Sequence, residues 1–291
     1  MSALVEKKLL GGINENEYSL GLTGNLQNDT QLLAIEDAVN FCFWAKKGEE
    51  KWTVEWPKGK VVSGGWFGLV AVFERAMAEN VPILDSKYLS QLTLDDVSTI
   101  FRSANRSEIP LINERLKNLI EIGKVLTNRF DGQFTNLVEE ANFDAVKMVE
   151  LVYNNIPSFR DVAEYDGHQV FFLKRAQILA NDLSYVSRKL RIKNLDRLTA
   201  FADYKIPQIL RHFGVLNYNS DLAKTVDHYQ LIPALSSQEV EIRAATIWGV
   251  DLIKQNLGRY TSSQIDNAIW LISQDQSSIN QPYHRTYSIF Y

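Results

Sequence analysis

The stretch LLAIEDAVNFCFW, residues 32–44, decides the fold that we expect for this chain. Its apolar residues fall on most sides of a helical repeat, so the pattern predicts a helix over 28–47 that is buried on most of its surface. A helix of this kind belongs in the core, because an apolar surface on every side needs partners on every side. We therefore expect a central helix with other elements packed around it.

A short β-hairpin is predicted directly after this helix. In KWTVEW, residues 51–56, bulky apolar side chains alternate with polar ones, as on a strand with one buried face. PKGK, residues 57–60, supplies the turn, and Val61 and Val62 begin the return strand. DGH at 166–168 indicates a second short strand pair. The β content is expected to be minor.

Helical periodicity predicts most of the remaining elements. Further helices are expected at 66–79, 94–104, 111–129, 171–190, 238–257 and 262–275, with one more inside FADYKIPQILRHFG, residues 201–214. Thr93 is the expected N-cap of the helix at 94–104, ahead of two acidic residues that suit the helix dipole. Ser262 or Ser263 is expected to cap the last helix. The fold class is therefore all-α, mainly helical with a minor β-hairpin.

No internal repeat, low-complexity tract or Pro/Gly-rich linker divides the 291 residues. We therefore expect one α-rich unit over 1–291, with 1–130 and 131–291 as sub-lobes within it. An apolar fraction of 45% and a charged fraction of 23% are typical of globular proteins, and the length allows a large core.

The charge balance of the chain is slightly acidic. Lys and Arg number 31 and Asp and Glu number 35, which gives a formal net charge of −4. A surface that holds long nucleic acid carries clustered positive charge instead. We therefore expect a small-molecule partner and no long nucleic acid. The sequence does not indicate an oligomeric state.

One cysteine, Cys42, cannot form an internal disulfide or build a zinc site alone, so the sequence favours a reducing compartment and hence the cytoplasm. Cys42 lies in an apolar run and is interpreted as a small core residue. The opening MSALVEKKLLGG is too charged for a signal peptide, and no window reaches about 18 apolar residues. We expect neither a signal peptide nor a membrane span.

Signature motifs of several large enzyme classes are absent from the sequence, namely GxGxxG, GxxxxGK[ST], HExxH and GxSxG. GGWFG at 64–68 brings three glycines together without a preceding buried strand, so close packing explains it better than cofactor binding. The histidines at 168, 212, 228 and 284 show no ligand spacing. We expect no cofactor and no metal.

Two acidic residues, Asp203 and Asp266, stand among aromatic or apolar neighbours instead of on a charged face. Asp203 precedes a helix, where a carboxylate either caps the helix or accepts hydrogen bonds from the N–H groups of a ligand. Asp266 stands early in its helix, with Trp270 one turn later on the same side, although an ordinary first-turn acid would look the same. By themselves, the residues indicate an α-rich protein with an acid-lined aromatic pocket.

Long stretches of the chain resemble the queuosine salvage protein family, whose members hydrolyse queuosine 5′-phosphate to release the base queuine. The blocks that carry the resemblance are EDAVNFCFW from Glu36, GGWFGLVAVFERAMAENVPI from Gly64, EIPLINERLKNLIEIGKVL from Glu108, PSFRDV from Pro157, FFLKRAQILANDL from Phe171, FADYKIPQIL from Phe201, EVEIRAATIW from Glu239 and PYHRTYSIFY from Pro282. The likeness extends over nearly the whole chain after its N-terminal segment.

The resemblance implies a mostly helical fold similar to the helix-hairpin-helix DNA glycosylases, acting on a nucleotide and not on a duplex. It implies that Asp266, in IDNAIW, is the catalytic residue, because the family associates an aspartate in an acid-x-x-Leu-Trp-like motif with glycosidic cleavage. Phe201 and Asp203 occupy the family's FADYR-like motif, which is associated with holding the deazaguanine base. Trp270 offers a second stacking face. Lys174, in FFLKRAQ, either meets the 5′-phosphate or a carboxylate, or is a solvated helix residue.

The chemistry of the reaction suits these roles. Breaking a ribose–base bond develops positive charge on the sugar, which the carboxylate of Asp266 can stabilise, attack or match with an activated water. A 7-deazaguanine has carbon in place of N7 of guanine, so the base is not protonated there and contacts at its edge must assist its departure. Asp203 is suited to accept hydrogen bonds from the ring N–H and amino groups of the base.

The chain departs from the family pattern where the side group of the base would lie. Leu271 follows Trp270 where an acid is frequent, and Asn267 stands where an aromatic residue is usual. Tyr18 stands about where many members have a histidine, and Asp275 is a candidate for the missing acid. We assign Asn267, Leu271 and Tyr18 to the substrate site, and the exact 7-deazaguanine nucleotide stays open.

Three functions agree with the sequence. The first is a hydrolase that cleaves the N-glycosidic bond of queuosine 5′-phosphate and releases queuine for salvage into tRNA modification. The second is a non-catalytic 7-deazaguanine nucleotide-binding protein. The third, a nucleic-acid glycosylase, rests on the fold analogy alone and is disfavoured by the net charge of −4.

Overall fold

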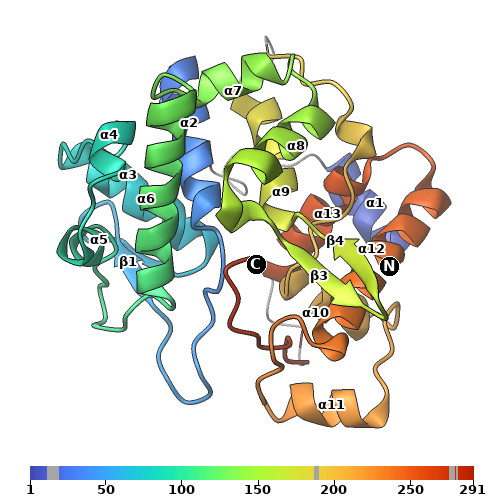
Figure 1. Cartoon of the computed structure of the whole chain (residues 1–291). Coiled ribbons are helices and arrows are strands. Elements are labelled where there is room, and N and C mark those ends of the chain that lie inside the picture. The colour runs from blue at the N-terminus through green and yellow to red at the C-terminus, as the bar shows by residue number, and fades with distance from the viewer. Residues whose placement is uncertain (12–19, 187–189, 275–278, 280) are drawn as a thin grey trace.

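The computed structural model describes residues 1–11, 20–186, 190–274, 279 and 281–291, and helices make up most of this part of the chain (Figure 1). The α-helices are α1 (Ser2–Leu10), α2 (Leu26–Ala38), α3 (Trp66–Ala78), α4 (Ser86–Leu89), α5 (Leu94–Ile100), α6 (Ile112–Arg129), α7 (Phe134–Glu140), α8 (Ala145–Asn155), α9 (Lys174–Val186), α10 (Lys205–His212), α11 (Ser220–Asp227), α12 (Ser237–Leu257) and α13 (Ser262–Gln274). The strands form two antiparallel hairpins, β1 (Thr53–Glu55) with β2 (Val61–Ser63) and β3 (Val162–Tyr165) with β4 (His168–Phe171). The prediction of a mainly helical fold with minor β structure is confirmed.

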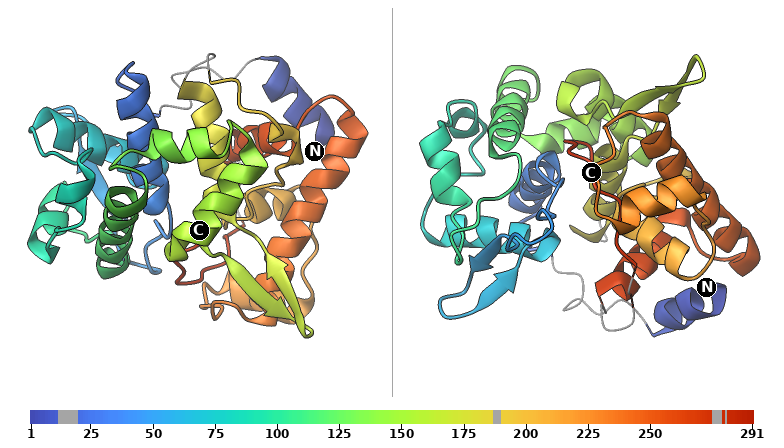
Figure 2. Two further views of the ribbon diagram at one scale, coloured as in Figure 1. Left: turned by 45° about the horizontal axis from the view of Figure 1, so that its top comes forward. Right: turned by 90° about the horizontal axis from the view of Figure 1, so that it is seen from below.

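Two groups of helices lie side by side in the molecule (Figures 1 and 2). Helices α2 to α6 and the first hairpin form one side, helices α10 to α13 form the other, and α8 and α9 lie between them. α9 packs on α2 of the first side and on α8. α1 departs from the order of the sequence, because it packs on α12 and α13. No helix of the described ranges has the length and apolar character that crossing a membrane requires.

The central helix is shorter than predicted. α2 is buried from Asp29 to Ala38, as its apolar run indicates, but it ends at Ala38 and not at residue 47. The chain continues as a buried, non-helical segment to Trp44, with Cys42 in the left-handed region at a φ of 46°. Cys42 is fully buried, as predicted. Periodicity did not reveal the end of the helix, because a buried helix and a buried irregular segment are equally apolar.

Side chains from distant helices explain why α2 ends here. Arg115 of α6 donates hydrogen bonds to the backbone carbonyls of Val39 and Phe41, and Arg175 of α9 donates to that of Ala38 at 2.5 Å. These cations satisfy buried carbonyl groups that a longer helix would have satisfied, and they lie at the negative end of the helix dipole. The segment after α2 is thereby held in a fixed position without a helical ladder.

The first hairpin is confirmed, and Trp52 anchors it to the core. The Trp52 indole Nε1 donates a hydrogen bond to the carbonyl of Phe101 at 3.0 Å. The glycines of GGWFG pack closely on the same residue. A Cβ on Gly64 would lie 2.3 Å from the Trp52 carbonyl oxygen, and one on Gly68 would lie 3.0 Å from its ring. Close packing therefore accounts for these two glycines.

The predicted helix caps have different outcomes. Thr93 caps α5 through a capping box, as predicted. α13 is capped by Thr261, whose hydroxyl accepts a hydrogen bond from the Gln264 N–H at 3.2 Å, so the prediction of Ser262 or Ser263 is wrong. The Gln264 side chain accepts from the Thr261 N–H at 2.9 Å in return. This reciprocal pair begins the helix at an earlier cap than we predicted.

Two predicted helices are shorter in the structure. α5 ends at Ile100 instead of 104, and α9 covers Lys174–Val186 within the described residues instead of 171–190. Phe171 belongs to β4 and Leu173 has a φ of 49°, so the chain turns before α9 begins. The second hairpin is confirmed, with the DGH turn at its tip.

A buried group of ion pairs connects the second hairpin to α9 and α12. Arg243 of α12 donates to both carboxylate oxygens of Asp161, at 2.8 and 2.6 Å, and lies 3.5 Å from a carboxylate oxygen of Glu239. Asp161 also accepts a hydrogen bond from the Lys174 backbone N–H at 3.1 Å. Because these charged groups are buried and paired, they hold β3, α9 and α12 in one arrangement. The first residue of α9 is therefore precisely placed.

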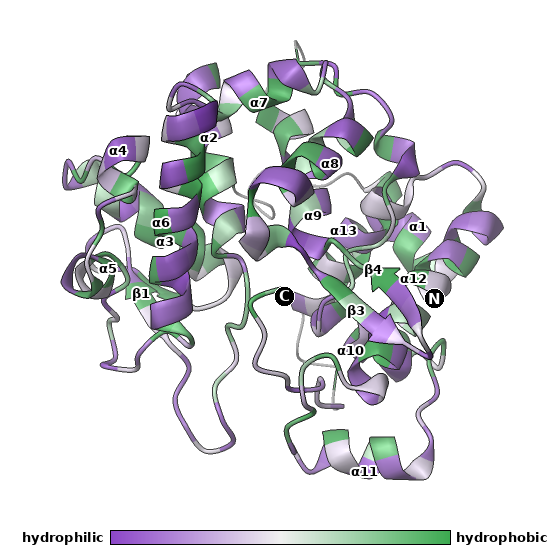
Figure 3. Ribbon diagram, in the orientation of Figure 1, coloured by the Kyte–Doolittle hydropathy of each residue, from purple (hydrophilic) through white to green (hydrophobic). Residues whose placement is uncertain are grey.

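The outer helices are amphipathic, which places the core inside. Hydrophilic and hydrophobic residues alternate along α6 and α11 (Figure 3). In α6, Leu119, Gly123 and Leu126 are buried, as their spacing predicts. The largest hydrophobic cluster extends from Leu20 to Leu198, and a second cluster joins α1 to α10, α12 and α13. These clusters account for the hydrophobic packing of the molecule. The charged and aromatic groups between the two sides are not explained by this packing.

Candidate active site

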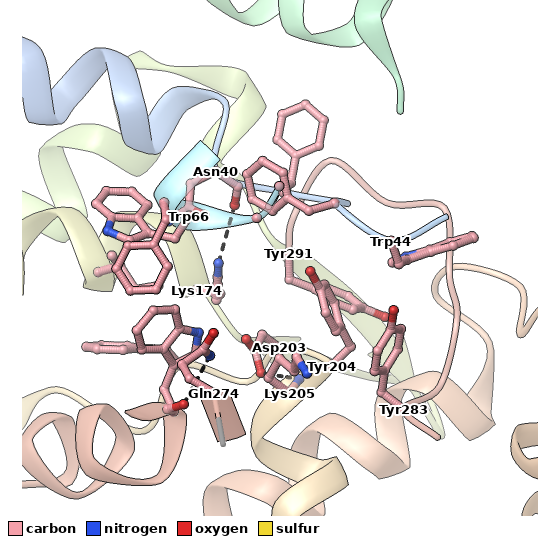
Figure 4. Close-up of a pocket in the computed structure, with 18 of the residues that line it drawn as sticks. Asn40, Trp44, Trp66, Lys174, Asp203, Tyr204, Lys205, Gln274, Tyr283 and Tyr291 are labelled. Carbon is pink, nitrogen blue, oxygen red and sulfur yellow. Dashed lines mark hydrogen bonds between the residues drawn. The ribbon is translucent and has the colours of Figure 1, made fainter. Parts of the chain in front are cut away.

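A cavity of about 390 Å³ lies where the two sides of the molecule meet (Figure 4). Its wall comes from segments far apart in the sequence, namely the buried segment after α2, the start of α3, α9, the turn before α10, α13 and the C-terminal tail. The aromatic side chains of the wall are Phe41, Phe43, Trp44, Trp66, Phe67, Phe201, Tyr204, Trp270, Tyr283 and Tyr291. The cavity therefore offers flat apolar surfaces to a ligand.

Asp266 of α13 lies in the wall of this cavity with 4% of its surface exposed. Its Oδ1 accepts a hydrogen bond from the Phe201 backbone N–H at 2.9 Å. Burial, and next the charge of Asp203, raise the pKa of Asp266 well above its ordinary value. A carboxyl group in this environment keeps its proton to a higher pH than a solvated aspartate.

Asp203 lies in the same wall, in the turn before α10. Its Oδ1 accepts from the backbone N–H groups of Lys205 and Ile206, at 2.7 and 2.8 Å, so the capping role weighed from the sequence is confirmed. The residue also lines the cavity, so capping does not prevent contact with a ligand. Burial raises the pKa of Asp203, while the charge of Lys174 and the two backbone donors oppose that rise. Asp203 is thus the acid whose ionised form is better stabilised.

Lys174 is buried, with 5% of its surface exposed, so the interpretation as a solvated helix residue is wrong. Its Nζ points to the backbone carbonyl of Asn40 and donates to it at 3.3 Å (Figure 4). Burial lowers the pKa of Lys174, while the charges of Asp203, Asp37 and Asp266 oppose that change. The sequence left open whether this lysine meets a phosphate or a carboxylate. In the structure, carboxyl groups are the charges that favour its ammonium form.

Three more of the predicted substrate residues line the cavity, namely Phe201, Trp270 and Asn267. The ring of Trp270 lies 5.5 Å from that of Phe67, so two aromatic rings lie together in the wall. The Asn267 amide donates to the hydroxyl of Tyr185 at 3.3 Å. The structure therefore brings together both predicted acids, the predicted stacking rings, Asn267 and Lys174.

The structure does not bring every predicted residue to this cavity. Leu271 is buried in α13 but is not among the residues of the cavity wall, because the helical rotation after Trp270 turns it to another side. Gln274, one turn beyond Trp270, lies in the wall instead. Tyr18 and Asp275 lie outside the described residues.

Sequence reasoning missed part of the wall. Trp44 and Tyr283 line the cavity, although neither was assigned to it. They come from NFCFW and PYHRTYSIFY, whose dense aromatic content was a usable signal. The prediction of a long central helix concealed the first of them by treating it as core. Lys51 and Lys205 also line the cavity, and nothing in their local sequence distinguishes them from surface lysines.

Other reactive groups are less suited to chemistry here. Among residues 1–11, 20–186, 190–274, 279 and 281–291, no group of three or more His, Cys, Asp or Glu side chains is arranged to hold a metal ion. Burial raises the pKa of the Cys42 thiol to about 11, so it is not prepared as a nucleophile. Burial lowers the pKa of His284 to about 3, so its imidazole is neutral at physiological pH. The carboxyl groups of the cavity are therefore the candidates for acid–base chemistry.

The cavity combines flat aromatic walls with a buried carboxyl group, a half-buried one and a buried lysine. Aromatic rings stack on flat ligands. Two neighbouring acids that differ in environment hold one proton between them over a range of pH, so that one is a carboxylic acid and the other a carboxylate. Such a pair can assist a leaving group and stabilise positive charge that develops beside it. These are the requirements of glycosidic bond cleavage.

Comparisons with known proteins identify the family of this chain. A family model described as "Queuosine salvage protein" matches residues 25–291. The chain is 46% identical over 266 residues to "Queuosine 5′-phosphate N-glycosylase/hydrolase" from Sphaerobacter thermophilus, covering 89% of this chain and 80% of that protein. It is 35% identical over 274 residues to the protein of the same name from Bos taurus, covering 88% and 80%. It is 32% identical over 256 residues to that from Schizosaccharomyces pombe, covering 83% and 73%.

Proposed function

This chain belongs to the queuosine salvage protein family, and from that premise we propose that it is a hydrolase that cleaves the N-glycosidic bond of queuosine 5′-phosphate. The products are queuine, which is salvaged into tRNA modification, and ribose 5-phosphate. The names of the relatives support the reaction. The observation that carries it to this chain is the pair of acids, half-buried Asp203 and buried Asp266, beside Lys174 in an aromatic cavity.

The catalytic residue of this proposal is Asp266, acting as a pair with Asp203. Burial raises the pKa of both acids, and the charge of Asp203 raises that of Asp266 further. Lys174 opposes the rise at both acids, together with two backbone donors at Asp203 and one at Asp266, and the rise is larger at Asp266. The first proton taken up by the pair therefore resides on Asp266. Asp266 then supplies a hydrogen bond and a proton to the departing base, and the Asp203 carboxylate stabilises positive charge on the ribose.

The bond changes in this scheme balance. The bond between ribose C1′ and the base nitrogen breaks, and its electron pair leaves with the base, which takes up the proton of Asp266. A water molecule forms the new bond to C1′ and gives a proton to the Asp203 carboxylate. Transfer of that proton to the carboxylate of Asp266 restores the pair. The interpretation from sequence alone placed Asp266 at the sugar, whereas this proposal places it at the departing base, on the ground that its pKa is raised well above the ordinary value.

The base would lie between aromatic rings in this proposal. Phe201 and Trp270 supply stacking faces, and Asn267 lies one residue from Asp266 in the same wall. A flat deazaguanine suits such surfaces, because stacking needs no particular ring substituents. Leu271 and Tyr18 stay proposals as substrate residues, since the first lies outside the cavity wall and the second outside the described residues.

The proposal also covers the relationship of the fold, the domain organisation and the location of the chain. The fold is proposed to be related to the helix-hairpin-helix DNA glycosylases, which the mainly helical architecture supports. The chain is proposed to act as one catalytic unit in the cytoplasm, with sub-lobes 1–130 and 131–291. Residues of both sub-lobes line the cavity, which supports catalysis by the whole unit. No organic cofactor or metal enters the scheme.

The test mixes the purified protein with queuosine 5′-phosphate in the presence of EDTA and follows free queuine by chromatography. We expect release by the wild type, and loss of most activity in Asp266→Asn and Asp203→Asn. Asp221→Asn is the matched control, because the Asp221 side chain is 89% exposed on α11. Binding of the nucleotide without release would favour the non-catalytic binding protein. Salt-sensitive cleavage of an oligonucleotide in place of the nucleotide would favour the nucleic-acid glycosylase.

A further inference from the structure

Three acidic side chains are fully buried on α2 and α9, two helices that pack on each other, and the proposed reaction uses none of them. They are Glu36 and Asp37 of α2 and Asp182 of α9, each with 0% of its surface exposed. None of the three is among the described residues of the cavity wall. Buried carboxylates are costly unless protons or cations balance their charge. Protons and cations must therefore be distributed among these acids.

Glu36 is the acid with the least favourable surroundings for a charge. Neither of its carboxyl oxygens has a hydrogen-bond partner among the described residues. Burial, and next the charges of Asp37 and Asp182, raise the pKa of Glu36 well above its ordinary value. Glu36 therefore keeps its proton and is neutral at physiological pH.

Asp37 has partners that favour its charged form. Its Oδ1 accepts a hydrogen bond from the side-chain amide of Asn40 at 3.1 Å. Burial, and next the charge of Asp182, raise the pKa of Asp37, while the Asn40 amide and the cations Lys174 and Arg175 oppose that rise. Of the two adjacent acids of α2, Asp37 is therefore the one that carries the negative charge.

Asn40 and Lys174 connect the charge of Asp37 with the cavity. The Lys174 Nζ donates to the backbone carbonyl of Asn40 at 3.3 Å (Figure 4), and the side-chain amide of the same Asn40 donates to Asp37. Lys174 lines the cavity together with Asp203 and Asp266, whereas Asp37 lies outside its wall. The charge of Asp37 is one of those that favour the ammonium form of Lys174 against burial. Asp37 thus reaches the two acids of the cavity through Lys174.

We propose that Asp37 is a positioning residue of the reaction, which acts through Lys174 by keeping this buried ammonium charged and fixed beside Asp203 and Asp266. This inference rests on the proposed function. A buried lysine loses its proton readily, and a negative charge close to it compensates for the burial. The charged lysine in turn favours the ionised Asp203 that the scheme requires. Because Asp37 lies outside the wall, it does so without occupying space that the ligand needs.

The direct test measures the pKa of Lys174 in the wild type, Asp37→Asn and Glu36→Gln by NMR of protein with ¹³C-labelled lysine. The signal that is absent in Lys174→Met identifies the residue. We expect Asp37→Asn to lower the pKa of Lys174 by about one unit, because a charge that favours the ammonium is lost. Glu36→Gln is the matched control, since it exchanges a neutral acid for a neutral amide at an adjacent, equally buried position, and no change is expected. Equal changes in both variants, or none in Asp37→Asn, would overturn the inference.

The pH profile of kcat for queuosine 5′-phosphate supplies a second readout. The charged and titratable groups that face Lys174 are Asp37 of α2, Arg175 of its own helix, Asp203 before α10 and Asp266 of α13, and those that face Asp37 are Glu36, Lys174, Arg175 and Asp182. Loss of one negative charge beside a coupled group lowers the pH at which that group gives up its proton. The alkaline limb is therefore expected to move to lower pH by about one unit in Asp37→Asn and to stay in place in Glu36→Gln. An alkaline limb that does not move in Asp37→Asn would contradict the role of Asp37.

The NMR titration needs no substrate, so it keeps the inference separate from the proposed hydrolysis. A protein that releases no queuine would overturn the proposed function, and the titration would still decide whether Asp37 keeps Lys174 charged. An active protein in which Asp37→Asn leaves the pKa of Lys174 unchanged would overturn the inference and leave the hydrolysis in place.

A third variant covers the case in which Asp37→Asn does not fold, which thermal unfolding detects. Asn40→Ala removes the amide that donates to Asp37 and keeps the backbone carbonyl that Lys174 contacts. It is expected to lower the pKa of Lys174 by less than Asp37→Asn does, because the charged form of Asp37 loses one donor and not the whole charge. A lower melting temperature with an unchanged pKa of Lys174 would show a purely structural role and overturn the inference.

Discussion

Two groups of largely buried charges in this protein differ in how completely they are paired. In the first, Arg243 donates to both oxygens of Asp161, at 2.8 and 2.6 Å. In the second, at the cavity, Lys174 donates to a backbone carbonyl, and Asp203 and Asp266 accept hydrogen bonds from backbone N–H groups. Asp266 and Lys174 are as inaccessible as the first group, and Asp203 is half-buried, so the main difference between the groups lies in pairing.

Pairing decides what each group can do. The carboxylates around Arg243 raise its pKa, so that group keeps its charge at any physiological pH and acts as a structural connection. At the cavity, burial raises the pKa of both acids, because no side-chain cation forms a direct ion pair with either in the described structure. Incomplete pairing thus brings the acids toward the pH range in which they exchange protons. This comparison would be wrong if mutations around Arg243 lowered activity and not stability, while mutations of the cavity acids lowered stability and not activity.

The largest expected effect is at the cavity. Asp266→Ala removes the acid that the scheme assigns to the departing base, and turnover is expected to fall about a thousandfold, or about 4 kcal/mol in the barrier. The free energy of unfolding is expected to change by no more than about 1 kcal/mol, since one hydrogen bond to Phe201 is lost while a desolvated acid is removed. Single-turnover kinetics and thermal unfolding measure the two quantities. A stable protein with full activity would exclude Asp266 from the reaction.

The next effect is at the paired group. Asp161→Asn removes the carboxylate that Arg243 binds through both oxygens, leaving it only the more distant Glu239, and is expected to lower the free energy of unfolding by about 3 kcal/mol. Urea denaturation measures this loss in the free energy of unfolding. Asp227→Asn breaks the more exposed pair with Arg211, where the Asp227 side chain is 44% exposed, and is the control with an expected loss below about 1 kcal/mol. If both variants lost the same free energy of unfolding, the buried ion pair would contribute no more to stability than the surface ion pair.

The pH profile sharpens the comparison. Activity requires Asp203 ionised and Asp266 protonated, so kcat is expected to rise as Asp203 loses its proton and to fall at higher pH as Asp266 does, by up to about tenfold per pH unit. Both limbs lie above the ordinary aspartate pKa, since burial raises both values. In Asp266→Asn the amide still donates a hydrogen bond, so residual activity is expected without the alkaline limb. A profile that is flat from pH 5 to 9 in the wild type would contradict the shared proton.

The smallest expected effect concerns stacking. Trp270→Leu is expected to raise KM for the nucleotide about fivefold, or about 1 kcal/mol, with kcat nearly unchanged. Trp248→Leu is the control, because Trp248 is 66% exposed and lies outside the cavity wall. Steady-state kinetics distinguish the two variants. A loss confined to kcat would instead place Trp270 at the reacting bond.

The fold was predictable wherever the residues of a single helix or hairpin showed the pattern of that element. α3, α6 and α12 follow apolar periodicity, and both hairpins follow from alternation and turn residues. The end of α2 was not predictable, because it depends on Arg115 and Arg175, which reach it from distant parts of the chain. The same limit applied to Leu271, which the motif assigned to the substrate and the helical rotation turns away from the cavity.

The sequence by itself determined the family, the mainly helical architecture and the two acids of the cavity, because long blocks of residues and local periodicity carry that information. Only the tertiary structure decided that Lys174 is buried beside those acids and that Asp161 is paired with Arg243. It also brought Trp44 and Tyr283, from opposite ends of the chain, into one wall. The physical reason is that desolvation and Coulomb interactions depend on distance and burial in space, which neighbours in sequence do not define.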